Sequence, residues 1–67
     1  MTIQEMIIRI KELCRLTGMS RAAVYEKLKP TSKYYDPDLP RPVRLGANMI
    51  GWRLSEVQAY IDSRERL

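Results

Sequence analysis

The spacing of hydrophobic residues changes twice in the first part of the chain, and each spacing predicts a different element. Residues 7–10 form a β-branched run interrupted by one arginine, which is too short for a helix and predicts one small strand. From Lys11 the spacing becomes helical, because Leu13 and Leu16 lie three residues apart on one face. Gly18 suits the left-handed conformation that ends a helix, so the first helix is predicted to stop at or just before it.

A second helix is predicted directly after this turn. Ser20 offers a side-chain oxygen that can cap the N-terminus of a helix, and the residues that follow it are good helix formers. Pro30 cannot continue the helical hydrogen bonds, so the helix is expected from about Arg21 to Lys29. Two short helices joined by a turn that contains glycine meet the physical requirements of a helix-turn-helix, here over about residues 10–29.

The middle of the chain predicts a loop and then a hairpin. Residues 30–40 concentrate prolines, aspartates and hydroxyl residues, which favour turns over regular structure. Two short strand-like pieces follow, on either side of Gly46 and Asn48, which tolerate the positive φ that a tight hairpin needs. Residues 41–53 are therefore predicted as a β-hairpin, the wing of the fold.

A third helix completes the predicted fold. Ser55 and Gln58 have the spacing of a capping box, and apolar residues follow at helical intervals, so a helix is predicted over residues 55–64. The elements give a mainly α fold with a small β-hairpin, a winged helix-turn-helix, expected as one domain over residues 1–67. Its expected core consists of Trp52 and the apolar residues at these spacings: Ile8, Ile10, Leu13, Leu16, Val24, Leu28, Val43, Leu45, Val57 and Ile61.

Length and composition narrow the function classes. The chain has 67 residues, one cysteine and no histidine, so an internal disulfide and the usual Cys/His zinc site are excluded and the commonest general base is missing. It also has no phosphate-binding glycine motif, so we expect no enzymatic activity and no cofactor. No apolar stretch approaches the roughly 20 residues that span a bilayer, and no secretory signal is visible. A cytoplasmic location without membrane contact is therefore expected.

The positive charge is concentrated in two segments. The formal net charge is +4, from 12 basic and 8 acidic residues. Residues 20–33 and 41–53 each carry a net charge of +3, whereas residues 34–40 and 54–67 are net acidic. Two basic segments separated by a turn-rich stretch are the pattern expected of a nucleic-acid face. The alternative is a solvated surface that only keeps a small domain soluble.

Three ordered motifs resemble one known family. They are RIKEL at residues 9–13, TGMSR at 17–21 followed by VY at 24–25, and PRPVRLG at 40–46 followed by GWR at 51–53 and SEV at 55–57. Together they resemble the AlpA-type phage and prophage transcriptional regulators, which belong with the excisionase-like and MerR-like winged-helix proteins. The resemblance implies a small winged helix-turn-helix domain that binds DNA to regulate prophage genes, often an integrase or excision function.

The chain departs from that family in the segment between the second helix and the wing. This segment, residues 30–39, is longer than the usual link, and Leu39 stands where the family often has an aromatic residue before the proline. The places of the two tyrosines in this segment, Tyr34 and Tyr35, do not follow from the resemblance.

The expected DNA contacts follow from how such a domain docks, with the N-terminal residues of the second helix nearest the base edges of the major groove. Arg21 can form a bidentate pair with guanine, worth about 1–3 kcal/mol of discrimination, or contact a phosphate. Trp52 is assigned to the core, although an exposed tryptophan could stack on a base. The full set of expected contacts is Ser20, Arg21, Ala22, Tyr25, Lys27, Lys29, Lys33, Arg41, Arg44, Asn48 and Arg53.

Double-stranded DNA is therefore the expected partner, with RNA polymerase or a recombinase as a second one. The predicted third helix is short compared with the long helix through which MerR-type regulators dimerise, so a monomer in solution, or weak cooperative association on DNA, is expected. Two alternatives stay open: an excisionase-like architectural protein that bends DNA, and a protein-interaction adaptor whose basic face binds an acidic partner instead.

Overall fold

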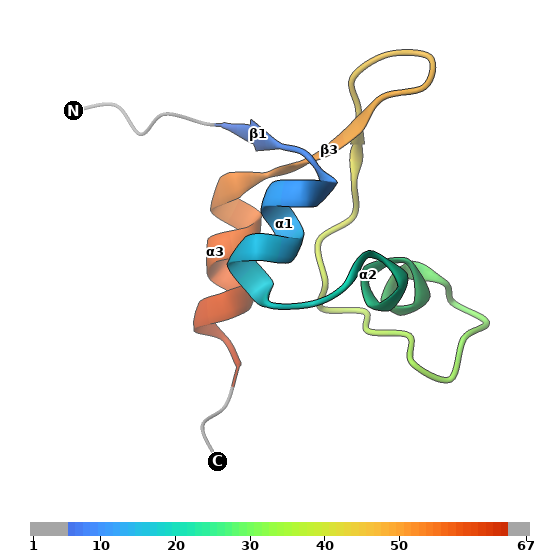
Figure 1. Ribbon diagram of the computed structural model, residues 1–67. Coiled ribbons are helices and arrows are strands. Elements are labelled where there is room, and N and C mark those ends of the chain that lie inside the picture. The colour runs from blue at the N-terminus through green and yellow to red at the C-terminus, as the bar shows by residue number, and fades with distance from the viewer. Residues whose placement is uncertain (1–5, 65–67) are drawn as a thin grey trace.

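The structure is a computed structural model that describes residues 6–64, and it contains three helices and a three-stranded antiparallel sheet (Figure 1). Within these residues no helix has the length and the apolar character that crossing a membrane requires. The mainly α winged helix-turn-helix fold predicted from the sequence is confirmed. In chain order, the elements are β1 (Ile7–Ile8), α1 (Ile10–Thr17), α2 (Arg21–Leu28), β2 (Val43–Arg44), β3 (Ile50–Arg53) and α3 (Leu54–Asp62).

The turn between α1 and α2 forms as the sequence predicts. Gly18 has a φ of 76°, in the left-handed region, and its N–H donates to the carbonyl of Cys14 at 2.8 Å, which closes α1. Ser20 is the N-cap of α2, and its Oγ accepts the N–H of Ala23 at 3.1 Å. Three residues therefore separate the helices, as a helix-turn-helix requires.

β3 is the central strand of the sheet, with β1 on one side and β2 on the other. Ile8 pairs with Trp52 in the first ladder, and Val43 pairs with Gly51 in the second. The predicted hairpin is thus confirmed, and β1 extends it to three strands. A Cβ on Gly51 would lie 2.5 Å from Cγ2 of Ile7 and 2.8 Å from the carbonyl oxygen of Ile8, so the absence of a side chain permits this close approach.

The hairpin turn closes differently from the prediction. The N–H of Leu45 donates to the carbonyl of Met49 at 2.8 Å. Among residues 6–64, Gly18 alone has a positive φ, so neither Gly46 nor Asn48 uses the conformation expected of it. A connection of five residues between the strands reverses the chain without a left-handed residue.

Two predicted boundaries are wrong. The strand expected over residues 7–10 is shorter, because α1 already begins at Ile10. The helix expected from Ser55 begins at Leu54 with Arg53 at the N-cap, so Ser55 lies inside the first turn and is not the N-cap residue that the predicted capping box requires. Instead the N–H of Leu54 donates to the main-chain carbonyl of Met6 at 2.7 Å, and the segment that leads into β1 satisfies the start of α3.

The core lies between the three helices and one face of the sheet. Trp52 is fully buried, and its indole N–H donates to the carbonyl of Pro40 at 3.1 Å, which confirms its packing role. Leu45 was expected in the core but is 42% exposed, because its side chain lies beside Gly51 on the other face of β3 from Trp52. The buried residues are Ile8, Leu13, Val24, Leu39, Trp52, Val57 and Tyr60, of which Leu39 and Tyr60 were not among those expected.

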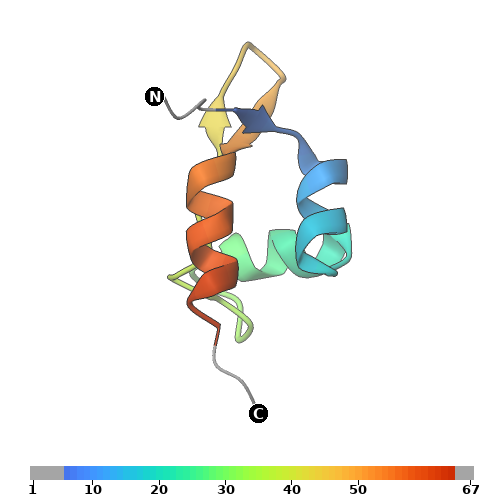
Figure 2. The same cartoon turned by 90° about the vertical axis from the view of Figure 1, so that its left-hand side faces the viewer.

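The elements separate into two sides. In Figure 1, α2, the residues that follow it and the hairpin tip lie on the right, whereas α3 and β1 lie on the left. Figure 2 looks from the left-hand side and shows α1 and α3 in front, with α2 crossing behind them. The second helix and the wing therefore face the same side of the molecule.

Candidate nucleic-acid interface

The first turn of α2 presents an open surface. Val24 is completely buried, which fixes the inner side of the helix. Arg21 and Ala22 are exposed, and Tyr25 is 42% exposed. Ser20 is exposed as well, but its Oγ already accepts the N–H of Ala23. The structure thus brings the four residues predicted at the N-terminal part of α2 together, with the Ser20 oxygen engaged in capping.

An acidic side chain lies among the basic residues at the end of α2. Glu26 accepts a hydrogen bond from Ser32 Oγ at 2.8 Å and one from Lys29 Nζ at 3.1 Å. The Ser32 hydrogen bond, followed by the hydrogen bond and the charge of Lys29, lowers the pKa of Glu26 from its ordinary value. The carboxylate remains ionised at neutral pH and offsets the charge of Lys29, although both groups are solvent-exposed and the pair is weak. The i, i+3 spacing of Glu26 and Lys29 was the signal in the sequence for this pair.

The two remaining predicted lysines are placed differently. Lys33 is exposed, and its Nζ lies 5.3 Å from the centroid of the Tyr34 ring. Lys27 is half-buried and lines a hollow that it shares with Tyr60 and Ile61 of α3. Lys27 also lines a second hollow with Ala22 and Ala23 of the first turn, so it lies on the flank of α2 between the exposed first turn and α3.

Arg41 is engaged in holding the end of α2. Its Nη1 donates to the carbonyl of Leu28 at 3.2 Å, and its Nη2 donates to the Tyr35 hydroxyl at 2.9 Å. The carbonyls of the last helical turn lack partners within the helix, so the guanidinium supplies one of them. The sequence contained no signal for this contact, because Leu28 and Arg41 lie 13 residues apart.

Two predicted contacts of the hairpin, Arg44 and Asn48, lie near its tip. Arg44 is exposed, and its Nη1 donates to the carbonyl of Ala47 at 3.3 Å across the turn. Asn48 is exposed in the same turn. Arg53 lies at the opposite end of β3, paired in register with Ile7, and the structure does not bring it to the tip. The hairpin tip and α2 nevertheless face one side of the molecule (Figure 1).

A cluster of four polar side chains, Asp36, Asp38, Tyr60 and Arg64, connects the segment after α2 to α3 and the residues that follow it. The Tyr60 hydroxyl donates to Asp36 Oδ2 at 2.8 Å, and Arg64 lies 3.5 Å from the same oxygen and 3.3 Å from Asp38 Oδ2. The Arg64 guanidinium also stacks on the Tyr60 ring, 4.2 Å from its centroid. Sequence patterns did not reveal this cluster, because it joins residues more than twenty positions apart.

The cluster shifts the pKa of two of its members. Burial by itself raises the pKa of Asp36, but the hydrogen bonds from Tyr60 and from the N–H of Asp38, with the charges of Arg64 and Lys27, outweigh it and lower the pKa. Burial, and then the hydrogen bond to Asp36, raise the pKa of Tyr60. At neutral pH the cluster therefore holds an ionised Asp36 and a neutral Tyr60.

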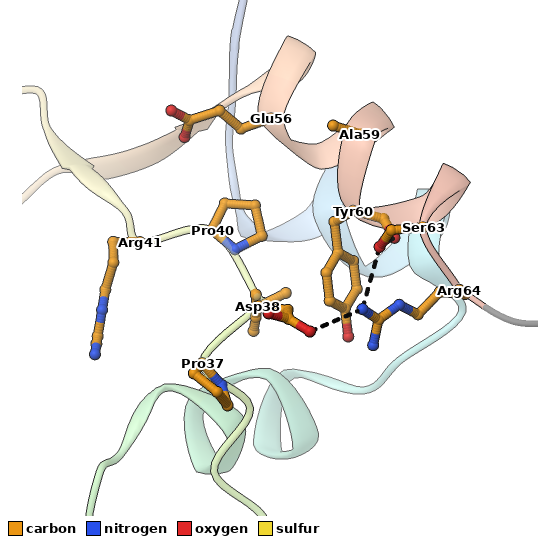
Figure 3. A pocket seen from close by; sticks show the side chains of 10 residues that line it. Pro37, Asp38, Pro40, Arg41, Glu56, Ala59, Tyr60, Ser63 and Arg64 are labelled. Atoms are coloured by element: carbon orange, nitrogen blue, oxygen red, sulfur yellow. Dashed lines mark hydrogen bonds and ion pairs between the residues drawn. The ribbon is translucent and has the colours of Figure 1, made fainter.

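The same cluster borders an open hollow of about 700 Å³ between α3 and residues 37–41 (Figure 3). Asp38 and Glu56 both line it, yet the Glu56 carboxylate points away from Asp38, and Asp38 is bonded to Arg64. Residues 6–64 contain no group of three or more side chains placed to hold a metal ion. The hollow lacks the converging carboxylates that acid–base chemistry would need.

Comparison with known proteins points to one family. The family model described as "Prophage CP4-57 regulatory protein (AlpA)" matches residues 6–66. The "DNA-binding transcriptional activator AlpA" of Escherichia coli (strain K12) is 34% identical over 61 residues, which cover 91% of this chain and 87% of that protein. The "Uncharacterized protein ORF88" of Enterobacteria phage P4 is 33% identical over 61 residues, 91% of this chain and 62% of that protein. No solved structure matches the chain.

Proposed function

The chain belongs to the AlpA family of prophage regulatory proteins, and we propose that it binds duplex DNA and regulates the transcription of phage or prophage genes. The observation that carries this proposal is the common orientation of two exposed elements. The first turn of α2 and the hairpin tip face one side, each with an exposed arginine, Arg21 and Arg44. An E. coli relative that is 34% identical is named a DNA-binding transcriptional activator, which supports the same function here.

We propose that α2 enters the major groove, whose width of about 12 Å admits one helix. Arg21, Ala22 and Tyr25 then lie nearest the base edges. Arg44 and Asn48 lie beside the neighbouring sugar-phosphate backbone. Phosphates attract the exposed cations of the helix and the hairpin, so DNA binding should weaken as the salt concentration rises. The logarithm of the affinity should fall by about 0.9 per tenfold rise in salt for each phosphate neutralised.

We also propose a protein partner: RNA polymerase, or a recombinase if the regulated step is integration or excision. While α2 and the hairpin contact DNA, the exposed side of α3 stays accessible to that partner (Figure 2). Gel shifts on circularly permuted duplexes separate the two roles, because an architectural protein that serves a recombinase bends its site strongly. An architectural role therefore predicts a large bend together with cooperative filling of adjacent sites.

The binding proposal is tested with the double variant Arg21→Ala/Arg44→Ala on duplexes selected from a random pool by the unmodified protein. Loss of one base contact and one phosphate contact should weaken selective binding by about 30-fold or more. The matched control is Lys11→Ala/Arg15→Ala, which removes the same charge from exposed positions on α1. We expect the control to lose less than about threefold.

Circular dichroism should show the same helix content in both double variants. Equal affinity of Arg21→Ala/Arg44→Ala and the unmodified protein in the gel shift would contradict the proposed interface. Failure of the unmodified protein to bind any duplex, even at low salt, would favour the adaptor alternative and reject DNA binding altogether.

A further inference from the structure

Tyr34 is the more exposed of two exposed tyrosines on the α2 side of the molecule, and both lie outside the core. Tyr34 follows α2 by six residues and is 59% exposed. Its backbone N–H donates to Ser32 Oγ at 3.0 Å, and this hydrogen bond holds the backbone from which the Tyr34 side chain projects. The apolar surface of an exposed tyrosine ring is stabilised when a ligand covers it. Because Tyr34 lies beside the helix that faces the ligand, its ring is a candidate for direct contact with that ligand.

Tyr34 forms one wall of a small hollow against α2. The other walls are Ala22, Ala23, Glu26 and Lys27, and the volume is about 240 Å³. The surface inside is almost entirely apolar. A water molecule takes about 30 Å³ in the liquid, so the hollow has room for a methyl group and part of the ring that carries it.

The surroundings of the hollow are cationic. Lys33 Nζ lies 5.3 Å from the centroid of the Tyr34 ring, and Lys27 lines the hollow itself. Arg21 is the neighbour of Ala22 in the exposed first turn. The Glu26 carboxylate is occupied by Ser32 and Lys29, which reduces its repulsion of an anion. An apolar floor with a positive rim fits a ligand that is apolar at one point and anionic around it.

Duplex DNA offers such a ligand in the major groove. The thymine C5-methyl is the apolar group that base edges present there, and alanine is a typical contact for it. Phosphates border the groove on both sides. We propose that the hollow between Tyr34 and α2 receives the C5-methyl of one thymine and so selects that base. This inference rests on the proposed function, because it places α2 in the major groove.

The test removes single methyl groups from DNA. Starting from the duplex that the unmodified protein selects from a random pool, each thymine is replaced in turn by uracil, which differs only by that methyl. Burial of one methylene-sized group corresponds to about fourfold in affinity, so one thymine should show a loss of about fourfold and the others little change. Binding is measured by fluorescence anisotropy at fixed salt.

Variants of Tyr34 then connect that thymine to the hollow. Tyr34→Ala removes the wall, so its ratio of affinities for the thymine and uracil duplexes should fall to nearly one. Tyr34→Phe keeps the ring and loses only the hydroxyl, so the fourfold ratio should persist. Tyr25→Ala removes the other exposed tyrosine of this side, and it should weaken binding to both duplexes while keeping the ratio.

Each outcome decides the matter. A fourfold ratio that disappears in Tyr34→Ala and persists in Tyr34→Phe supports the inference. Selective binding with no dependence on any thymine methyl overturns it and leaves the proposed function standing, as does a ratio that Tyr34→Ala preserves. A gain in affinity from methylating a cytosine, without a loss at any thymine, also overturns it. Absence of any selective binding by the unmodified protein removes the proposed function and this inference together.

Discussion

Substitution of Gly51 by alanine should destabilise the fold more than the same substitution at either other glycine of the chain. A Cβ at this position would lie 2.5 Å from Cγ2 of Ile7, 2.8 Å from the carbonyl oxygen of Ile8 and 3.1 Å from Cδ1 of Leu45. The Ile7 and Leu45 side chains can rotate away. The Ile8 oxygen belongs to the backbone of the neighbouring strand, so β1 has to move away from β3.

The expected cost follows from these contacts. Overpacking that displaces a backbone costs about 1–3 kcal/mol and occasionally more, and two of the three contacts are shorter than 3.0 Å, so we expect about 2–4 kcal/mol. A fold of this length has a free energy of unfolding of about 3–10 kcal/mol, of which this is a large part. The melting temperature should fall by about 4–8 °C for each kcal/mol lost.

The other two glycines supply the controls. Gly18→Ala places a side chain at a φ of 76° with no atom within 4 Å, so only backbone strain of about 1–2 kcal/mol remains, partly offset by the lower entropy of the unfolded chain. A Cβ at Gly46 would meet only Cβ of Met49 at 4.0 Å, so Gly46→Ala should change stability by less than about 0.5 kcal/mol.

Urea denaturation followed by fluorescence measures all three variants, because Trp52 is the single tryptophan of the chain and is fully buried in the folded state. The expected order of destabilisation is Gly51→Ala, then Gly18→Ala, then Gly46→Ala. If Gly51→Ala proves no less stable than Gly46→Ala, then the close approach of β1 to β3, and with it the anchoring of α3 by the segment before β1, is refuted.

Two further predictions concern the segment after α2. Because the pKa of Asp36 is lowered in the fold, its carboxylate stabilises the protein above the unfolded-state pKa of about 3.9, and this stabilisation is lost as the pH falls through the lower folded-state value. Urea denaturation should therefore find Asp36→Asn less stable by about 1–3 kcal/mol at pH 7, and this difference should shrink as the pH falls below about 3.9. The exposed Asp38→Asn is the comparison, and we expect a smaller effect from it. Arg41→Ala should lower the free energy of unfolding by about 1 kcal/mol, because the hydrogen bonds to Leu28 and Tyr35 are lost. It should leave unchanged the slope of the logarithm of DNA affinity against the logarithm of salt concentration. A decrease of about 0.9 in the size of that slope would instead show that Arg41 neutralises a phosphate.

Features that depend on neighbouring residues were predictable from the sequence. The left-handed Gly18, the Ser20 cap and the end of α2 before Pro30 each depend on a side chain or backbone preference within a few residues. The apolar spacing also located the helices and the hairpin, since burial of one face is what stabilises them. These local signals were sufficient for the order of elements and the fold class.

The capping box shows why a local signal can fail. Ser55 and Gln58 have the right spacing, but α3 begins one residue earlier, at Leu54, whose N–H donates to the carbonyl of Met6 from a distant part of the chain. The spacing gives no information about such a distant acceptor. Burial of Leu39 and Tyr60 was missed for the same reason, because their neighbours in the core come from other parts of the chain.

In the candidate interface, too, some features were predictable from neighbouring residues and others were not. Exposure of Arg21, Ala22 and Tyr25 follows from the helical period once Val24 is placed inside, so the sequence was sufficient for this part. The engagement of Arg41 with the end of α2 depends on how the connecting segment folds back, which residue types alone do not determine.

That connecting segment holds α2 in place from two directions. The N–H of Asp36 donates to the carbonyl of Lys27 at 2.9 Å, while its carboxylate accepts the Tyr60 hydroxyl of α3. Arg41 binds the last turn of α2 from the other end of the segment. The angle between α2 and the rest of the domain is thus fixed by contacts on both sides of the helix end. Because the same segment places Tyr34 beside α2, the orientation of the helix and the chemistry of the surface it presents are determined together.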